Sequence, residues 1–251
     1  MVRKNPDDVD VHMGFAFPDT YEIGMSYMGM QILYNILNKN SRIYCERVFA
    51  PASDMEMIMR RQHRSLYSLE TFTPVGALDI LGFTLQYEMS YTNILNMLDL
   101  GGIPVRKADR ASADGRYPLV VAGGPCAFNP EPLADFVDVF LIGDGEELLE
   151  KVCIAFADAK EACGNNGHVR DMFYDTIKKF DGVYIPDSGQ TVVNRAVVSD
   201  IDKAVFPVDN IVPFIDTVHD RSVIETFRGC TRGCRFCQAG MIYRPVRERK
   251  P

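Results

Sequence analysis

Three cysteines near the end of the chain form the pattern with the most specific chemistry. Cys230, Cys234 and Cys237 have a CxxxCxxC spacing within eight residues, whereas no other two of the seven cysteines lie closer than ten positions apart. Cysteine thiolates are the usual protein ligands of iron–sulfur clusters, and three of them can hold three irons of a cubane and leave the fourth open. Gly229 and Gly233 suit a backbone wrapped around a cluster, because glycine tolerates positive φ. The pattern therefore predicts a three-cysteine cluster site.

Other uses of the three cysteines fit less well. A generic CxxC can also be a zinc site or a redox pair. A structural zinc site takes four ligands, typically as two separated pairs, and the closest upstream histidine is His219. Three thiols form an odd set for disulfides, and nothing in the sequence indicates an oxidising compartment. A ferredoxin run would offer CxxCxxC and a fourth cysteine.

The whole chain has the composition of a soluble globular protein. Its 251 residues, 47% hydrophobic and 24% charged, are enough for one large or two ordinary domains. No apolar run approaches the ~20 residues of a membrane span. The basic pair Arg3-Lys4 is not followed by an apolar stretch, so the start of the chain does not resemble a signal peptide. We therefore expect a cytoplasmic protein with no membrane partner.

Charge is unevenly distributed along the chain. Residues 228–251 carry seven basic side chains and one acidic one, a net charge of +6. Because the whole chain has a net charge of −7, residues 1–227 carry −13. The basic segment could contact nucleic acid. We favour a second interpretation, in which the arginines surround an anionic cluster site or pair with acids elsewhere.

Apolar runs along the first 160 residues predict a parallel sheet. Five strands are expected, at 11–18, 42–49, 78–86, 118–122 and 137–142. Helices are expected between and after them, at 26–38, 54–63, 92–100 and from the turn at 143–147 to about residue 160. Strands that alternate with helices, and lack polar alternation, predict a doubly wound, five-stranded parallel α/β domain over residues 1–160. Ligands of such sheets bind beyond the carboxyl ends of the strands.

Glycine-rich turns follow several of these strands. None is a GxGxxG that opens a helix, so the dinucleotide fingerprint is absent. Each glycine could simply form a tight turn, and the acids after Gly143 could complement a helix dipole. The residues concerned are Gly24, Gly123, Gly124, Gly143 and Gly145, with Asp144, Glu146 and Glu147 as the acids.

The remaining segments are predicted as a connector and the start of a second domain. Residues 161–219 form the connector, with a helix at 171–180 and a hairpin that pairs 182–186 with 191–193. Residues 221–228 predict a strand that delivers the cysteine loop at its carboxyl end, the usual place for barrel chemistry. Residues expected to be solvated or structural are His168, His219, Cys45, Cys126, Cys153 and Cys163.

The cysteine loop, Cys-Thr-Arg-Gly-Cys-Arg-Phe-Cys, resembles the cluster loop of radical S-adenosylmethionine (radical SAM) enzymes. The resemblance implies that Cys230, Cys234 and Cys237 bind a 4Fe–4S cluster whose open iron chelates SAM, with Phe236 near the adenine. It also implies reductive cleavage of SAM to methionine and a 5′-deoxyadenosyl radical, with an external electron donor such as a flavodoxin or ferredoxin. Substrate and catalytic residues are not implied; methyl transfer, sulfur insertion and RNA or peptide modification are all compatible.

The first domain resembles the cobalamin-binding-like domain that many radical SAM proteins carry. Phe-Pro-Asp-Thr-Tyr-Glu-Ile-Gly-Met-Ser, Ala-Gly-Gly-Pro and Leu-Ile-Gly-Asp-Gly-Glu-Glu carry this resemblance. Together with the cysteine loop and Arg-Pro-Val-Arg-Glu-Arg at 244–249, they make nearly the whole chain similar to a family of uncharacterised radical SAM proteins. The implied corrinoid site comprises Asp19, Tyr21, Gly24, Gly123, Gly124, Gly143 and Gly145.

One motif departs from that of cobalamin domains. Domains that ligate cobalt through histidine carry DxHxxG, whereas Asp19, Tyr21 and Gly24 give DxYxxG here. Tyrosine is a poor cobalt ligand in this role, so the resemblance does not extend to a histidine-ligated cobalamin. The domain could bind a corrinoid without a protein ligand, bind another molecule or serve as a scaffold.

The radical SAM core of the family is a partial βα barrel, and fourteen residues follow Cys237. We therefore expect residues 220–251 to be the start of a truncated radical SAM domain, inactive alone, with the remainder of the barrel as its partner. Two alternatives remain. The chain could be a corrinoid- or nucleotide-binding module with an inert cysteine loop, or a cluster-bearing electron-transfer or interaction protein.

Overall fold

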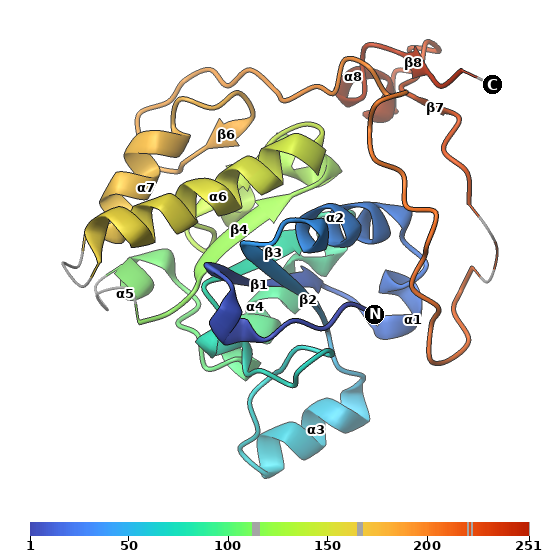
Figure 1. Ribbon diagram of the computed structural model, residues 1–251. Coiled ribbons are helices and arrows are strands. Elements are labelled where there is room, and N and C mark those ends of the chain that lie inside the picture. Colours follow the sequence, from blue (N-terminus) through green and yellow to red (C-terminus); the bar gives the residue numbers. More distant parts are fainter. Residues whose placement is uncertain (112–115, 165–167, 220, 222, 251) are drawn as a thin grey trace.

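The computed structural model describes residues 1–111, 116–164, 168–219, 221 and 223–250. A six-stranded sheet with the order β2-β1-β3-β4-β5-β6 forms its centre (Figure 1). Strands β1 to β5 run parallel, and β6 pairs antiparallel with β5. The strands are β1 (Val11–Phe17), β2 (Ile43–Phe49), β3 (Ile80–Thr84), β4 (Leu119–Gly123), β5 (Val139–Leu141) and β6 (Val183–Tyr184).

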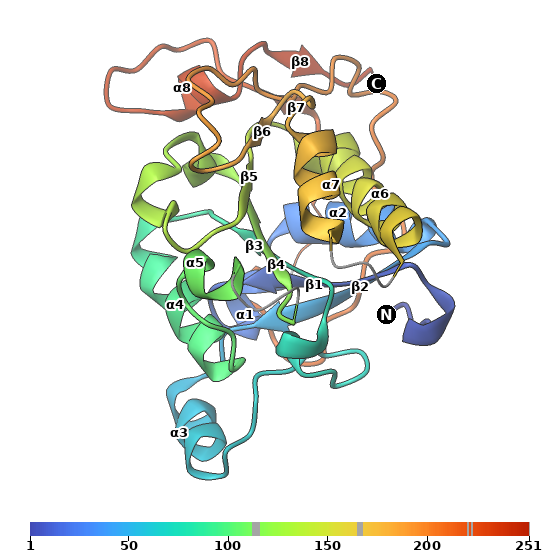
Figure 2. The same cartoon turned by 90° about the vertical axis from the view of Figure 1, so that its left-hand side faces the viewer.

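Helices cover both faces of the sheet, as Figure 2 shows. The α-helices of this part are α1 (Tyr21–Gly24), α2 (Met28–Lys39), α3 (Ser53–Arg61), α4 (Tyr91–Leu100), α5 (Lys107–Ala111), α6 (Gly145–Cys163) and α7 (Val169–Ile177). Short 3₁₀ turns are η1 (Pro6–Asp8), η2 (Val75–Ala77), η3 (Glu88–Ser90), η4 (Pro125–Phe128) and η5 (Glu131–Leu133). Helices α2, α6 and α7 pack on one face, and α4 packs on the other together with Met59 of α3.

Each central strand sends side chains into both layers. Val121 of β4 packs into the layer of α2 and α6, whereas its neighbour Val120 packs into the layer of α4. Successive side chains of a strand point to opposite faces, so an all-apolar run is buried on both sides. This burial explains why the five expected parallel strands form where the apolar runs predicted them.

The predicted number of strands is wrong, because a sixth strand extends the sheet. Val183 of β6 is buried and lies opposite Leu141, so two residues from the predicted connector complete the edge. The predicted hairpin is also wrong, since residues 191–193 form no strand. Instead, the Gly182 carbonyl accepts from the Ile142 amide at 2.7 Å, and the Gly182 amide donates to the Asn194 carbonyl. The first bond joins Gly182 to the residue after β5, and the second joins it to the chain just after the predicted second arm, without a strand pairing.

The C-terminal segment forms a small unit of its own. Strands β7 (Phe227–Arg228) and β8 (Arg247–Glu248) pair antiparallel, and the cysteine loop and α8 (Ala239–Ile242) lie between them. The strand predicted at 221–228 is therefore confined to its last two residues among those described, and its partner is antiparallel. The start of a βα barrel stays a prediction.

Two further expectations can be compared with the fold. Among the described residues, no helix combines the length and apolarity that crossing a membrane requires. All seven cysteines are free thiols. Cys45, Cys126 and Cys153 are buried as expected, whereas Cys163 at the end of α6 is partly exposed.

Candidate functional site

A cavity of about 420 Å³ lies at the carboxyl ends of the central strands. Phe15, Thr84 and Leu141 line it from β1, β3 and β5, and the first residues of α2 and α6 close its sides. The C-terminal segment contributes Arg228 and Tyr243, among others. Ligands of parallel α/β sheets bind at this edge. The cavity therefore occupies the position that the strand pattern predicted for a ligand site.

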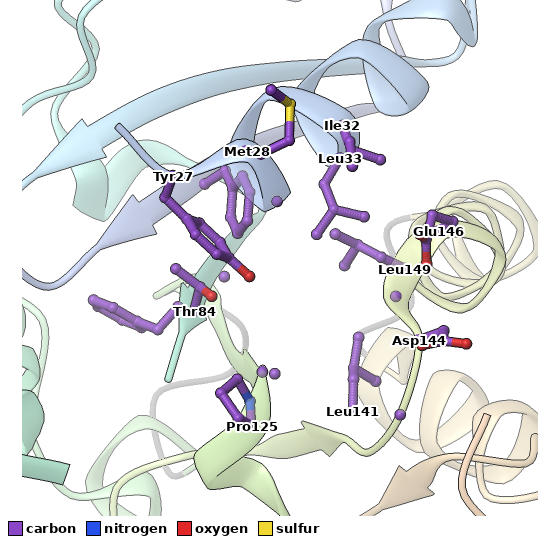
Figure 3. Close-up of a pocket in the computed structure, with 18 of the residues that line it drawn as sticks. Tyr27, Met28, Ile32, Leu33, Thr84, Pro125, Leu141, Asp144, Glu146 and Leu149 are labelled. Atoms are coloured by element: carbon purple, nitrogen blue, oxygen red, sulfur yellow. The ribbon is translucent and has the colours of Figure 1, made fainter. Parts of the chain in front are cut away.

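Most of the cavity wall is apolar, with hydroxyl groups in one corner and charged side chains at the edge near the C-terminal segment. Figure 3 shows Leu33, Leu141 and Leu149 across the cavity from Tyr27 and Thr84. Burial, followed by the nearby Tyr243, raises the pKa of Tyr27 to about 12, although hydrogen bonding with Gln86 and Thr84 acts in the opposite direction. The Tyr27 hydroxyl is therefore neutral at physiological pH and can both donate and accept a hydrogen bond. Such a site suits a largely apolar group with a polar end.

Four of the predicted glycines line this cavity: Gly123, Gly124, Gly143 and Gly145. At two of these positions the backbone conformation itself requires glycine. Gly124 has a φ of 103°, and an added Cβ would lie 2.9 Å from the Leu85 carbonyl oxygen. Gly143 has a φ of 114°, and its Cβ would lie 2.1 Å from the Ala196 carbonyl oxygen. A tight-turn role therefore accounts for these two positions without any ligand.

The DxYxxG residues do not line the cavity. The Tyr21 hydroxyl accepts a hydrogen bond from the Phe214 amide at 2.9 Å, and the Tyr21 ring meets Phe49 edge-on at 5.2 Å. A Cβ on Gly24 would lie 2.3 Å from the same Phe49 ring. Asp19 accepts from the Thr20 amide at 2.8 Å through its own side chain. Tyr21 thus binds a distant chain segment, Gly24 allows close packing against Phe49, and Asp19 bonds to the next residue, so the motif has structural uses here.

The cysteine loop begins immediately after β7. Cys230 and Cys237 are partly exposed, Cys234 is exposed, and the ring of Phe236 is 93% exposed. The Cys237 amide donates to the Cys234 carbonyl at 3.1 Å, which forms a turn between the second and third cysteines. Gly229, which precedes the first cysteine, lines the cavity. The loop thus lies beside the carboxyl edge of the sheet.

The donor set fits an iron–sulfur cluster by its chemistry. Three free thiols lie in one short loop, and Gly229 and Gly233 have φ values of 100° and 65°, as a wrapped loop requires. Their arrangement is not preformed: in the part of the chain that the structure describes, no three Cys, His, Asp or Glu side chains gather closely enough to hold a metal ion. Cluster binding would have to draw the three thiols together.

Acids at the start of α6 bind arginines on both sides of the cysteine loop. Glu146 lies 2.5 Å from Arg228, and Asp144 forms an ion pair with Arg247. The carboxylate of Asp144 points away from the centre of the cavity in Figure 3, consistent with this pairing. All four side chains are at most 13% exposed. The helix dipole alone could explain acids at this position, but Asp144 and Glu146 also have specific arginine partners.

A third acid, Glu225, completes this group of charges. It accepts two hydrogen bonds from Arg228, at 2.6 and 3.1 Å, and another from Arg249 at 2.8 Å. Burial opposes the ionisation of Glu225, but the hydrogen bonds from the two arginines outweigh it and hold its pKa below the usual range. Burial likewise disfavours the charge on Arg228, yet Glu225 and Glu146 raise its pKa. These contacts confirm, for Arg228, Arg247 and Arg249, that the basic segment pairs with acids.

Sequence reasoning missed most of the cavity wall. No sequence motif marks Tyr27, Thr84 or Tyr243, since the fold brings each of them to the cavity from segments that are distant in the sequence. Glu225 had a weak signal, because it precedes Arg228 by three positions. Such a spacing is common for ion pairs and does not by itself indicate a site.

Comparison with known proteins places this site in context. The family model described as "Radical SAM proteins, N-terminal" matches residues 29–186, more than half of the chain. "Uncharacterized protein MJ0966" from Methanocaldococcus jannaschii is 25% identical over 242 residues, which are 95% of this chain and 43% of that protein. The chain thus spans less than half the length of this curated relative.

A solved structure has a similar fold. It is the radical SAM methyltransferase TsrM from Kitasatospora setae, determined with its tryptophan substrate and the SAM analogue aza-SAM. The TM-score is 0.54 at 13% identity, over 95% of this chain and 43% of that one. At this identity the likeness concerns the fold alone. The family match, together with a cysteine loop beside the carboxyl edge of the sheet, supports one conclusion: this chain belongs to the radical SAM proteins, in the family defined by their N-terminal region.

Proposed function

We propose that this chain is the N-terminal portion of a radical SAM iron–sulfur enzyme, in which Cys230, Cys234 and Cys237 bind a 4Fe–4S cluster and SAM. The observation that carries the proposal is the set of three free, accessible thiols in one loop at the carboxyl edge of the sheet, next to the cavity. Residues 1–160 would form the cobalamin-binding-like domain, 161–219 the connector and 220–251 the start of the radical SAM domain.

Each part of the loop has a proposed role. The three thiolates would hold the cluster, and a bound cluster would supply the electron that cleaves SAM to methionine and a 5′-deoxyadenosyl radical. The exposed Phe236 ring offers an apolar surface for the adenine. The two positive-φ glycines allow the loop to tighten around the ligand. Substrate and type of reaction are left open by this proposal.

Exposed apolar side chains support a further covering partner. Ile224, Phe236 and Met241 are 78%, 93% and 65% exposed, all within the C-terminal segment. Apolar side chains gathered in this way on one segment favour contact with another protein surface. We propose the remainder of the radical SAM barrel as that surface, and an external flavodoxin or ferredoxin as electron donor.

Anaerobic reconstitution tests the proposed function. The chain is loaded with iron and sulfide, reduced with dithionite, and examined by EPR with and without SAM. We expect a reduced 4Fe–4S signal whose g values change on addition of SAM, because SAM would bind the iron without a thiolate. A cluster signal that SAM leaves unchanged would favour the electron-transfer alternative. Failure to bind any cluster would reject the proposal.

The cavity supports a second candidate, a corrinoid- or nucleotide-binding module. Four glycine positions at the strand ends line an apolar cavity with a polar corner, which suits an organic ligand. Gly145 provides a direct test, because an added Cβ would lie 3.5 Å from Leu33, an ordinary contact. Gly145→Leu should therefore fill the cavity without a backbone clash.

The matched control is Glu147→Leu, on the same helical turn but with a side chain 69% exposed. Titration with hydroxocobalamin, followed by absorbance, should show binding to the wild type and to Glu147→Leu, and weaker binding to Gly145→Leu. Equal binding by all three proteins would place the ligand outside the cavity. No binding by any of them would reject the corrinoid form of this candidate.

A further inference from the structure

We infer that Asp144 and Glu146 are positioning residues for the cysteine loop, which they hold through the two arginines that flank it. Arg228 precedes Cys230 by two positions, and Arg247 follows Cys237 by ten. Asp144 is the N-cap residue of α6 and Glu146 lies in its first turn, in the α/β domain, whereas the arginines lie about 80 to 100 residues later in the sequence. The inference rests on the proposed role of the loop as a cluster site.

The need for these acids follows from the pairing of β7 with β8. Arg228 and Arg247 are register partners, directly opposite one another on the two antiparallel strands. Like charges in that position destabilise a strand pair. The pair is also only two residues long on each side, too short to be stable alone. The hairpin that closes the cysteine loop therefore depends on anions supplied from outside it.

Asp144 provides the first contact. One of its carboxylate oxygens, Oδ2, binds Nη1 of Arg247 and also accepts a hydrogen bond from the Val198 amide at 2.8 Å. The same Nη1 donates to the Val198 carbonyl. The acid is itself fixed, because its amide donates to the Ala196 carbonyl at 2.9 Å. Arg247 is thus held against the backbone of Val198.

Glu146 provides the second contact. Its Oε1 lies 2.5 Å from Nη2 of Arg228, and Nε and Nη2 of the same guanidinium donate hydrogen bonds to Glu225. Arg228 therefore bridges α6 to the segment that leads into the cysteine loop. Its side chain is 13% exposed and that of Glu146 is 11% exposed, so water screens the contact weakly. Removal of the Glu146 charge leaves Arg228, among the described residues, closely paired only with Glu225, in its own segment, and 3.8 Å from Asp144, so the close contact with α6 is lost.

Helix-dipole stabilisation is the alternative explanation for these acids, and Glu147 separates it from the inference. Glu147 lies in the same first turn, where an acid favours the helix N-terminus equally. Its side chain is 69% exposed and pairs with Lys151, four residues along the same helix. Glu147→Gln therefore removes a charge that compensates the helix dipole, and it leaves the ion pairs between the start of α6 and the C-terminal segment in place.

The first experiment measures hydrogen exchange by mass spectrometry on the chain without cluster. In Asp144→Asn and Glu146→Gln, we expect peptides covering 226–249 to exchange about tenfold faster or more, because a charge-assisted hydrogen bond that limits local opening is lost. Peptides covering β3 should be unchanged, which also verifies that the variants fold. Glu147→Gln should match the wild type. If Glu146→Gln exchanges no faster than Glu147→Gln, the inference is wrong.

The second experiment separates positioning from mere stability. Each variant is reconstituted, and the EPR signal and midpoint potential of its reduced cluster are measured. We expect Glu146→Gln to shift both relative to Glu147→Gln, and Glu146→Asp to restore part of the shift. Faster exchange with an unchanged EPR signal and potential would show a structural role only and overturn the inference. If no variant and no wild-type chain binds a cluster, the proposed function fails, whereas the exchange result still reports on the contacts.

Discussion

Replacement of Gly229 by alanine should disrupt the entry to the cysteine loop. Gly229 has a φ of 100°, and an added Cβ would lie 2.7 Å from the Tyr243 carbonyl oxygen and 2.9 Å from the Val246 Cα. Both neighbours are backbone atoms in the segment that leads from the cysteine loop into β8, so neither can be moved by rotation of a side chain. The β7–β8 pair must therefore separate, or the loop must change its path.

The cost can be worked from these two effects and compared with a matched glycine. A left-handed backbone costs an L-residue about 1–2 kcal/mol, and forced overpacking costs about 1–3 kcal/mol. Gly229→Ala should therefore destabilise the hairpin by about 2–5 kcal/mol. Gly233 has a φ of 65°, and nothing lies within 4 Å of its added Cβ. Gly233→Ala should carry only the first cost, about 1–2 kcal/mol.

Hydrogen exchange of peptides covering 226–229 and 243–249 measures this difference. The two variants differ by the overpacking cost of about 1–3 kcal/mol; since about 1.4 kcal/mol corresponds to a tenfold change, these peptides should exchange about 5- to 140-fold faster in Gly229→Ala than in Gly233→Ala. Peptides from β3 and β4 should exchange equally in both variants, because the sheet is not in contact with either glycine's added atom. Equal exchange of the hairpin in the two variants would refute the reasoning.

Three other predictions concern the thiols, the core and cobalt. Burial raises the pKa of Cys153 to about 12 and that of Cys45 well above its usual value. Both thiols should therefore react with iodoacetamide far more slowly than the exposed Cys234. Equal labelling of the three cysteines, measured by mass spectrometry, would contradict this prediction. Arg47 and Glu70 form an ion pair with fully buried side chains. Glu70→Gln should lower the free energy of unfolding in urea by about 3–5 kcal/mol, and a loss below about 1 kcal/mol would contradict a buried charge left unpaired. Reduced cobalamin bound to the chain should show no EPR superhyperfine splitting from a protein histidine, since Tyr21 replaces the histidine of DxHxxG; such splitting would show the reverse.

The sheet was predictable because its strands follow from local composition. Residues such as Phe83 and Val120 are apolar in sequence and buried in the structure, and strand–helix alternation determined the parallel order. Strand β6 was not predictable. It consists of two residues, and the burial of Val183 against β5 results from tertiary contact and leaves no periodic pattern. For that reason the predicted sheet lacked its sixth strand.

The candidate site was predictable only where the chain itself carries the chemistry. The cysteine spacing and the glycines at the strand ends were visible in the sequence. The hydrogen bond that Tyr21 accepts was not visible in the sequence, because its partner Phe214 lies 193 positions away. The pairing of Glu146 with Arg228 likewise depends on the fold, which brings the start of α6 beside β7. Contacts at such separations leave no spacing that one sequence can reveal.

The ligand assignment of the cysteine loop is tested most directly by single serine substitutions. Each variant is reconstituted with iron and sulfide without oxygen, and its visible absorbance and its iron and sulfide content per chain are compared with those of the wild type. Cys230→Ser, Cys234→Ser and Cys237→Ser should each lose the cluster, because each thiolate binds one iron. Cys163→Ser, which removes a partly exposed thiol outside the loop, should retain it. A cluster that survives in the triple variant of Cys230, Cys234 and Cys237 would contradict the account.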